Sequence, residues 1–152
     1  CPQDAIVKAG PSAGLGLNTP HIEPRNMPCF LCTDLPCITA CPDGALVWPV
    51  RKEAGAQAES PARPGPEAVR MGTARVKESL CLTYAREVRE ALACQTCVDR
   101  CPYPGVAIRI GEPAEGQAIG HPIVDLETCT GCGLCVFGCP TPEPAIVVDP
   151  RR

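Results

Sequence analysis

The residues with the clearest chemistry are the cysteines of Cys129–Pro140, which follow the pattern C-x2-C-x2-C-x3-C-P. Three thiolates spaced in this way wrap a turn of backbone around one iron–sulfur cubane, and the fourth, before a proline, ligates a neighbouring cluster. Gly131 and Gly133 suit a backbone that curls tightly around an inorganic core. The spacing therefore predicts 4Fe-4S binding. A disulfide- or zinc-stabilised binding module is the alternative, and it has to explain both the regular spacing and the terminal proline.

Composition supports a core that is not built from ordinary side chains. The 152 residues include 13 Cys, 19 Pro and 14 Gly, and only 3% are aromatic. A chain so poor in large apolar residues needs another filling for its centre. The net charge of −3 and the pI near 5.4 argue against a nucleic-acid or anionic-membrane partner. No apolar run approaches the roughly 20 residues of a membrane span.

A phrase of Cys-Pro followed by a short apolar run occurs four times. The copies are Cys1–Val7, Cys41–Val47, Cys101–Ile108 and Cys139–Val148. Each is typical of a cluster loop that runs into a short strand. Cys1 is then the last ligand of a first motif, and we interpret the chain as a fragment of a four-motif protein. An acylated N-terminal cysteine of a lipoprotein is the alternative for Cys1.

The second and third motifs are variations of the last one. The second is Cys29-x2-Cys32-x4-Cys37-x3-Cys41, and the third is Cys81-x12-Cys94-x2-Cys97-x3-Cys101. The long insert of the third, Leu82–Ala93, has apolar residues on one side and charged residues on the other, which predicts a helix. We expect that helix to cover the cluster, with partner binding as the alternative.

The lead-in to the last two motifs also repeats, since Val76 and Val124 each precede the first cysteine by five residues. A strand before and after each loop, with a helical turn at Gly133–Gly138, forms the β-α-β half of a bacterial ferredoxin. The predicted fold class is α+β, loop-rich, with tandem ferredoxin-like two-cluster modules. Residues 1–53 are expected to form the C-terminal part of the first module and residues 67–152 the second. The segment 54–66 is a Pro/Ala/Gly linker, and residues 10–28 are expected to be a loop between halves.

Spacing decides how the motifs pair. Cys1 and Cys29 are 28 positions apart, and so are Cys101 and Cys129, which favours pairing of adjacent motifs. Nested pairing, which would send Cys101 to the second motif, is the alternative. Cys41 is left for a cluster completed upstream of this sequence. The three complete sets are cluster A, with Cys1, Cys29, Cys32 and Cys37; cluster B, with Cys81, Cys94, Cys97 and Cys139; and cluster C, with Cys101, Cys129, Cys132 and Cys135.

The sequence offers no sign of catalysis by this chain itself. It has no Gly-rich phosphate loop, no nucleophile–base pair and no recognisable pair of catalytic carboxylates. His21 and His121 lie outside the Cys motifs and are expected to be solvated loop residues. We therefore expect an electron-transfer subunit without a substrate site. Structural clusters in an assembly factor are the alternative.

The whole chain resembles the NapG-like and MauM-like ferredoxin-type proteins. The resemblance is carried by Pro20–Leu46, Arg70-Met71-Gly72, the widened gaps of the second and third motifs, and Cys129–Gly133. It implies four 4Fe-4S clusters in the full-length protein, three of them complete here, and a place on the periplasmic side of the inner membrane. It also implies electron transfer from a quinol-oxidising membrane partner to a periplasmic reductase, as in nitrate reduction. An accessory role in methylamine dehydrogenase maturation, or membership of another oxidoreductase complex, is the alternative.

Overall fold

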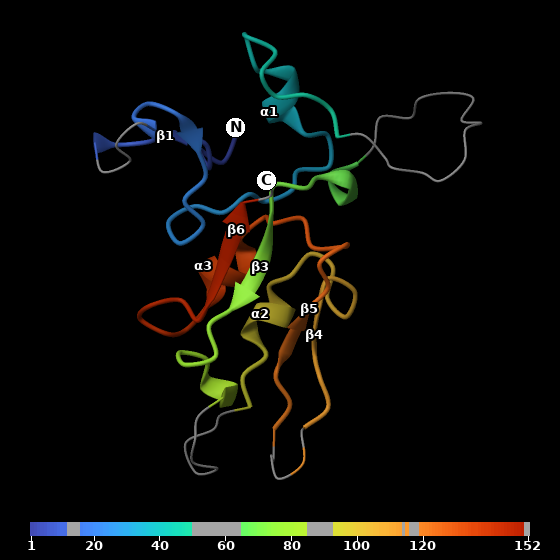
Figure 1. Cartoon of the computed structure of the whole chain (residues 1–152). Helices are drawn as coiled ribbons and strands as arrows, with labels where there is room; N and C mark the ends of the chain where they lie inside the picture. The colour runs from blue at the N-terminus through green and yellow to red at the C-terminus, as the bar shows by residue number, and fades with distance from the viewer. Residues whose placement is uncertain (12–15, 50–64, 85–92, 114, 116–118, 151–152) are drawn as a thin grey trace, which may run out of the picture.

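The computed structural model describes residues 1–11, 16–49, 65–84, 93–113, 115 and 119–150. Short helices and strands alternate with long loops, so the fold is loop-rich α+β (Figure 1). Within these residues, no helix is long and apolar enough to cross a bilayer. The linker 54–66, apart from its last two residues, and most of the insert 82–93 lie outside the described residues. At their edges, Pro66–Ala68 and Leu82–Tyr84 form single turns of 3-10 helix.

Two antiparallel ribbons frame the C-terminal half. Strand β3 (Gly72–Val76) pairs with β6 (Ile146–Pro150), with Val76 opposite Ile146. Strand β4 (Ile108–Ile110) pairs with β5 (Pro122–Val124). The strands predicted before and after the third and fourth motifs are therefore confirmed. Their pairing joins the start of one motif to the end of the other, as Figure 1 shows for β3 and β6.

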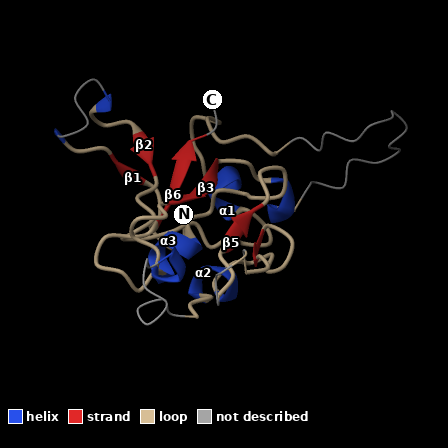
Figure 2. Ribbon diagram, turned by 60° about the horizontal axis from the view of Figure 1, so that its bottom comes forward, coloured by secondary structure: helices blue, strands red, loops and turns tan. Residues whose placement is uncertain are grey.

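Two short helices lie side by side, below the strands in the view of Figure 2, one against β4 and the other against β6. They are α2 (Thr96–Asp99), which follows Cys94, and α3 (Leu134–Gly138), which confirms the predicted helical turn. A helix of four or five residues has little stability of its own in water. Packing must hold them, and each one carries a cysteine of its motif on its first turn.

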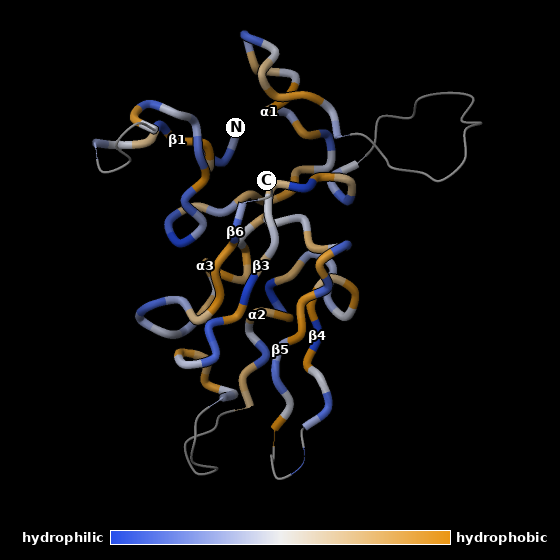
Figure 3. The backbone as a smooth tube through the Cα atoms, in the orientation of Figure 1, coloured by the Kyte–Doolittle hydropathy of each residue, from blue (hydrophilic) through white to orange (hydrophobic). Residues whose placement is uncertain are grey.

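The core beneath these elements contains sulfur as well as hydrocarbon. Its buried members are Ala74, Ile108, Cys129, Cys135, Val136 and Ile146. Figure 3 shows hydrophobic residues along β6 and next to α3, around the same centre. Cysteine is among the most buried residue types, but here it makes up a third of a very small core. This composition agrees with the prediction that ordinary side chains alone would not fill the centre of the protein.

The N-terminal part is less regular. Strand β1 (Val7–Lys8) pairs with β2 (Pro20–His21), so the segment expected to be a plain loop contains one short strand. Helix α1 (Pro36–Thr39) contains Cys37. The prediction of a strand after Cys41 is wrong, because Ala45–Val47 is not a strand and Val47 is 74% exposed. A strand needs a partner, and none of the described residues pairs with this segment.

The glycines of the last motif are required by the backbone and by a close contact. Gly131 has φ +74°, and a Cβ at this position would collide with the backbone of Gly72 at the start of β3. Met71 N–H also donates to the Thr130 carbonyl at 2.9 Å. The cluster loop therefore lies directly against the β3 strand, closer than any side chain permits.

This contact gives a matched pair of substitutions. Gly105 also has a positive φ, +78°, but a Cβ there would meet nothing within 4 Å. We expect Gly105→Ala to cost about 1–2 kcal/mol of unfolding free energy, from backbone strain alone. Gly131→Ala should cost about 2–5 kcal/mol, because overpacking adds to the same strain. Urea unfolding followed by circular dichroism measures the difference, and equal losses would contradict the close contact.

Candidate metal centres

The last motif places three thiols around a tight loop that ends in α3. Cys129, Cys132 and Cys135 are all buried, each less than 10% exposed. Gly133 has φ +83° and precedes the first residue of α3. Ala74 N–H in β3 lies 3.4 Å from Cys129 Sγ and donates to it. This loop and β3 together hold the three sulfurs within the core.

Cys101 lies with this set. Burial raises the pKa of the Cys101 thiol, and the nearby thiols of Cys132 and Cys129 raise it further. Burial is also the main cause of the raised pKa of Cys135, followed by the charges of Cys132, Cys129, Cys97 and Cys101. The four cysteines assigned to cluster C therefore lie close together, and Cys101 packs against the core that contains Cys129 and Cys135.

The four cysteines assigned to cluster B line one small pocket. Its walls also include Val76, Leu82, Pro122 and Ile146, so the pocket is mostly apolar. Burial and the thiols of Cys81 and Cys94 raise the pKa of Cys97 to about 11. The pocket cysteines are Cys81, Cys94, Cys97 and Cys139.

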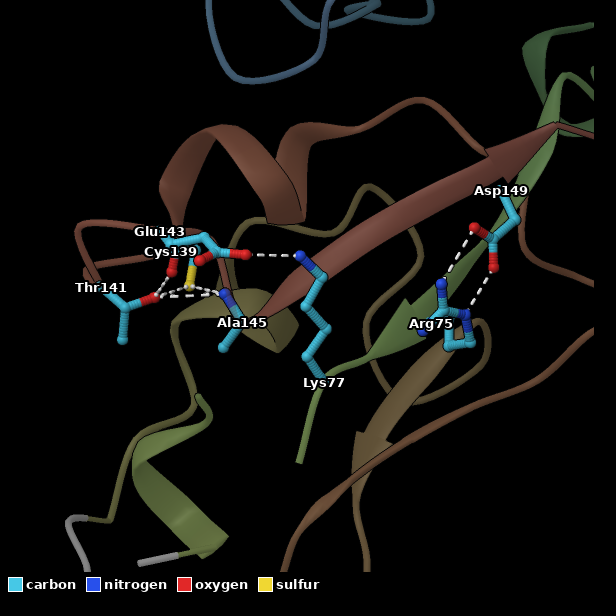
Figure 4. Close-up of polar contacts among 7 residues, drawn as sticks. All are labelled: Arg75, Lys77, Cys139, Thr141, Glu143, Ala145 and Asp149. Atoms are coloured by element: carbon cyan, nitrogen blue, oxygen red, sulfur yellow. Dashed lines mark hydrogen bonds and ion pairs between the residues drawn. The ribbon is translucent and has the colours of Figure 1, made fainter. Parts of the chain in front are cut away.

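Cys139 differs from the other thiols of this pocket in its polar contacts. Burial raises its pKa, but contact with the Thr141 hydroxyl and hydrogen bonds from the backbone N–H groups of Thr141 and Ala145 outweigh burial, and the net pKa is lowered. Ala145 N–H donates to Cys139 Sγ at 3.3 Å, and Thr141 Oγ1 lies 3.1 Å from the same sulfur (Figure 4). The backbone after Cys139 therefore folds back to stabilise a negatively charged sulfur.

The cysteines assigned to cluster A lie in the N-terminal part. Burial raises the pKa of Cys29, and the thiols of Cys132, Cys37 and Cys32 add to this effect. Cys1, Cys29 and Cys37 line a wide hollow with Pro20, His21 and Ile38. Cys32 is not part of that lining but lies near Cys29.

Cys41 is arranged as two other cysteines before proline, Cys101 and Cys139, are. Backbone N–H groups, chiefly that of Leu46, lower the pKa of its thiol. Cys101 likewise accepts from Tyr103 N–H at 3.4 Å. The loops after Cys41, Cys101 and Cys139 thus all direct backbone donors at sulfur.

The N-terminal part is joined to the last motif by direct contacts. Cys29 N–H donates to the Cys132 carbonyl at 2.9 Å. The Arg25 guanidinium donates to the carbonyl oxygens of Cys139, at 2.9 Å, and Thr141, at 3.2 Å. A Cβ on Gly133 would collide with Pro24. Residues 24–29 therefore pack on the loop that carries the last motif, and sequence patterns gave no sign of this contact.

The two histidines have different surroundings. His21 is exposed in β2. His121 was expected to be solvated, which is wrong: it is half-buried, and its ring stacks on Tyr84 with centroids 3.8 Å apart. Two stacked rings shield each other from water in this way. The two residues are far apart in the sequence, so no local pattern predicted the contact.

The donor chemistry of the three sets suits iron–sulfur clusters. Soft thiolates in groups of four are the usual ligands of such clusters, and backbone N–H groups directed at sulfur stabilise their negative charge. Within the described ranges, no three His, Cys, Asp or Glu side chains are placed to hold a single metal ion. A cubane is a different case, because each of its four cysteine ligands binds a separate iron.

Comparisons with known proteins agree with this chemistry. A family described as "4Fe-4S binding domain" (Fer4_2) matches residues 120–141. The methylamine utilization ferredoxin-type protein MauM of Paracoccus denitrificans is 36% identical over 154 residues, covering 99% of this chain and 60% of its own length. The ferredoxin-type protein NapG of Escherichia coli is 32% identical over 155 residues, covering 99% of this chain and 59% of its own length.

A shorter match, 35% identical over 60 residues, is to the ferredoxin-type protein NapF of Haemophilus influenzae; it covers 40% of this chain and 29% of the relative. The expected resemblance to NapG-like and MauM-like ferredoxin-type proteins is confirmed. The chain spans about three fifths of the length of the MauM and NapG relatives. No solved structure matches it significantly.

The contact made by Arg25 can be tested by substitution. Arg25→Ala removes the charge-assisted hydrogen bonds to the carbonyls of Val136, Cys139 and Thr141, and we expect the free energy of unfolding to fall by about 1–2 kcal/mol. For a chain of this size that is a fall in Tm of about 2–8 °C. Arg25→Lys should keep part of the stability, because an ammonium reaches one carbonyl but cannot fork between two. An unchanged Tm in Arg25→Ala would show that the segment is held by other contacts.

Proposed function

We propose that this chain, which is similar over nearly its whole length to ferredoxin-type proteins, relays single electrons from a quinol-oxidising membrane partner to a periplasmic reductase of the nitrate reductase type. The observation that carries the proposal is the grouping of cysteines into sets that suit clusters. When bound in these sets, 4Fe-4S clusters each accept and release one electron. The chain itself acts as a carrier without a substrate site of its own.

The cysteine contacts support pairing of adjacent motifs. Cys139 shares a pocket with Cys81, Cys94 and Cys97, as expected for cluster B. Cys101 interacts with Cys132 and Cys129, as expected for cluster C, whereas nested pairing would need it beside Cys29. The proximity of Cys29 to Cys132 fits a contact between two neighbouring clusters. Tandem modules, with residues 67–152 as a complete one, follow from this pairing.

The same contacts suggest the order of the centres along the route. Cys29 of cluster A donates its N–H to the carbonyl of Cys132 in cluster C. Cys135 of cluster C in turn interacts with Cys97 of cluster B, across the contact between α2 and α3. The proposed route therefore runs A–C–B. Residues 24–29 join cluster A to cluster C, and helices α2 and α3 join cluster C to cluster B.

The protein residues hold the centres and control their access to water. The thiols of Cys129, Cys132 and Cys135 are buried, so the middle of the route is shielded. The outer sets are more exposed: Cys1 is open to solvent and the cysteines of cluster B are half-buried. A buried cysteine set in the middle of the route and more accessible sets at its ends suit a carrier that receives an electron at one end and delivers it at the other.

The name of one relative favours a second candidate. The Paracoccus protein is named for methylamine utilization, which suits an accessory protein for a periplasmic dehydrogenase. For both candidates we propose a periplasmic location in association with the inner membrane. The route of centres favours the relay, because an accessory protein with structural clusters has no need for linked centres.

A reductive titration tests the relay. Anaerobically loaded protein should be reduced by a quinol-linked donor and reoxidised by a periplasmic reductase preparation, which visible absorbance of the clusters follows. Dithionite-reducible clusters that neither partner touches would favour the accessory role. Protein without acid-labile sulfide would remove both proposals.

Metal content tests the three ligand sets. We expect about twelve irons per chain with comparable sulfide, four for each cubane. Cys97→Ser should lose about four irons, because it breaks the cluster B set. Cys41→Ser is the matched control and should leave the iron content of this chain unchanged, since its three partners are not among these 13 cysteines. Loss of iron from Cys41→Ser would show that the sets are assigned wrongly, and zinc without sulfide would exclude iron–sulfur clusters altogether.

A further inference from the structure

The pocket assigned to cluster B has a feature that the other two sets lack. Three of its four cysteines are followed two residues later by a threonine, and each threonine hydroxyl lies near the cysteine sulfur. The oxygen–sulfur distances are 3.3 Å for Thr83 and Cys81, 3.6 Å for Thr96 and Cys94, and 3.1 Å for Thr141 and Cys139. Among the described residues, no other cysteine sulfur has a hydroxyl partner.

The direction of these hydrogen bonds changes when sulfur becomes a metal ligand. In the free thiol, Cys94 S–H donates to the Thr96 hydroxyl. A ligand sulfur has no proton, so only the hydroxyl can donate. Thr83 and Thr96 have no other acceptor among the described residues, and Thr83 is only 3% exposed. Their protons are therefore available to the sulfurs of Cys81 and Cys94.

Thr141 is different, because its proton already has an acceptor. Its hydroxyl donates to the Glu143 carbonyl at 2.6 Å and accepts from Ala145 N–H (Figure 4). Cys139 instead receives the Ala145 N–H at 3.3 Å. Arg25, which contacts the Cys139 carbonyl, adds a positive charge nearby. The donors that distinguish this pocket from the other two sets are thus the hydroxyls of Thr83 and Thr96.

Helix α1 provides an internal comparison. Thr39 also lies two residues after a cysteine, Cys37 of cluster A. Its hydroxyl donates to the Pro36 carbonyl at 3.3 Å instead of contacting sulfur. The Cys-x-Thr spacing alone therefore does not produce the contact. The local backbone of the cluster B loops does.

Hydrogen bonds to ligand sulfur stabilise the more negative, reduced state of a cluster, and so does access to water. Against cluster C both effects favour cluster B, which has the hydroxyl donors and half-buried cysteines, whereas the cysteines of the last motif in cluster C are buried. Cluster A is as accessible to water as cluster B, since Cys1 is exposed. Against cluster A the hydroxyl donors are therefore the difference, because no hydroxyl contacts a sulfur of that set among the described residues.

We infer that the hydroxyls of Thr83 and Thr96 raise the reduction potential of cluster B above those of clusters A and C, so that a single electron on the chain resides at cluster B. This inference rests on the proposed electron relay and gives it a direction. Cluster B becomes the end from which an acceptor draws the electron. The two threonines are positioning residues, since they act through the ligand sulfurs.

The test is an EPR-monitored redox titration of the full chain, loaded anaerobically. We expect Thr83→Val and Thr96→Val each to shift the highest of the three midpoint potentials to a more negative value, with the double variant shifting it further. The serine variants of both residues keep the hydroxyl and should retain the native potential. Thr39→Val is the matched control, with the same spacing and no sulfur contact, and should leave all three potentials unchanged.

The results that would contradict this inference differ from those that would contradict the proposed electron relay. Thr83 is buried, so its valine variant can fail to assemble through packing alone. The half-buried Thr96, at the first residue of α2, then decides the result. If Thr96→Val keeps its iron but moves no potential, or moves a lower one, the inference is wrong while the relay stands. Loss of the cluster from Thr96→Val would also contradict it, because a tuning hydroxyl is not needed to bind iron. A native chain that its partners cannot reduce would instead remove the proposed function.

Discussion

The constraint on which this structure depends is that sulfur takes the place of a large hydrocarbon core. With 3% aromatic residues, the chain buries small residues, a few branched side chains and the thiols of its last motif. A buried thiol is a weak substitute for a large apolar side chain, and short helices such as α2 and α3 do not stand alone. Cluster binding would add the cohesion that these elements lack, since binding to the folded state alone stabilises that state.

Close backbone contact is the second consequence of this small core. The loop around Gly131 lies against β3, and Gly133 lies against Pro24. Elements that would normally be separated by side chains approach until their main chains touch. The same closeness gives the Cys29 N–H its partner on Cys132, so the packing that stabilises the fold also connects the proposed centres. Stability and the proposed electron route thus depend on the same residues.

The sequence predicted those features that local spacing determines. The Cys motifs, the turn at α3 and the strands around Ile108 and Ile146 all follow from residues within a few positions of one another. Features that depend on a distant partner were missed. Ala45–Val47 has a strand-like composition but no partner strand among the described residues, and His121 meets Tyr84 across 37 positions of sequence. The contact of residues 24–29 with the last motif also has no local signal, because Arg25 binds carbonyl oxygens that any residue could supply.

Iron-edge anomalous diffraction from crystals of the anaerobically loaded chain tests the central claim most directly, because it locates the metal centres without assuming any ligand. The account predicts three iron centres in a row, with the middle one bound by Cys101, Cys129, Cys132 and Cys135 and lying next to the centre bound by Cys29. The end centre should be bound by Cys81, Cys94, Cys97 and Cys139. A centre that joins Cys101 to Cys29, Cys32 and Cys37 would contradict both the pairing of adjacent motifs and the route A–C–B.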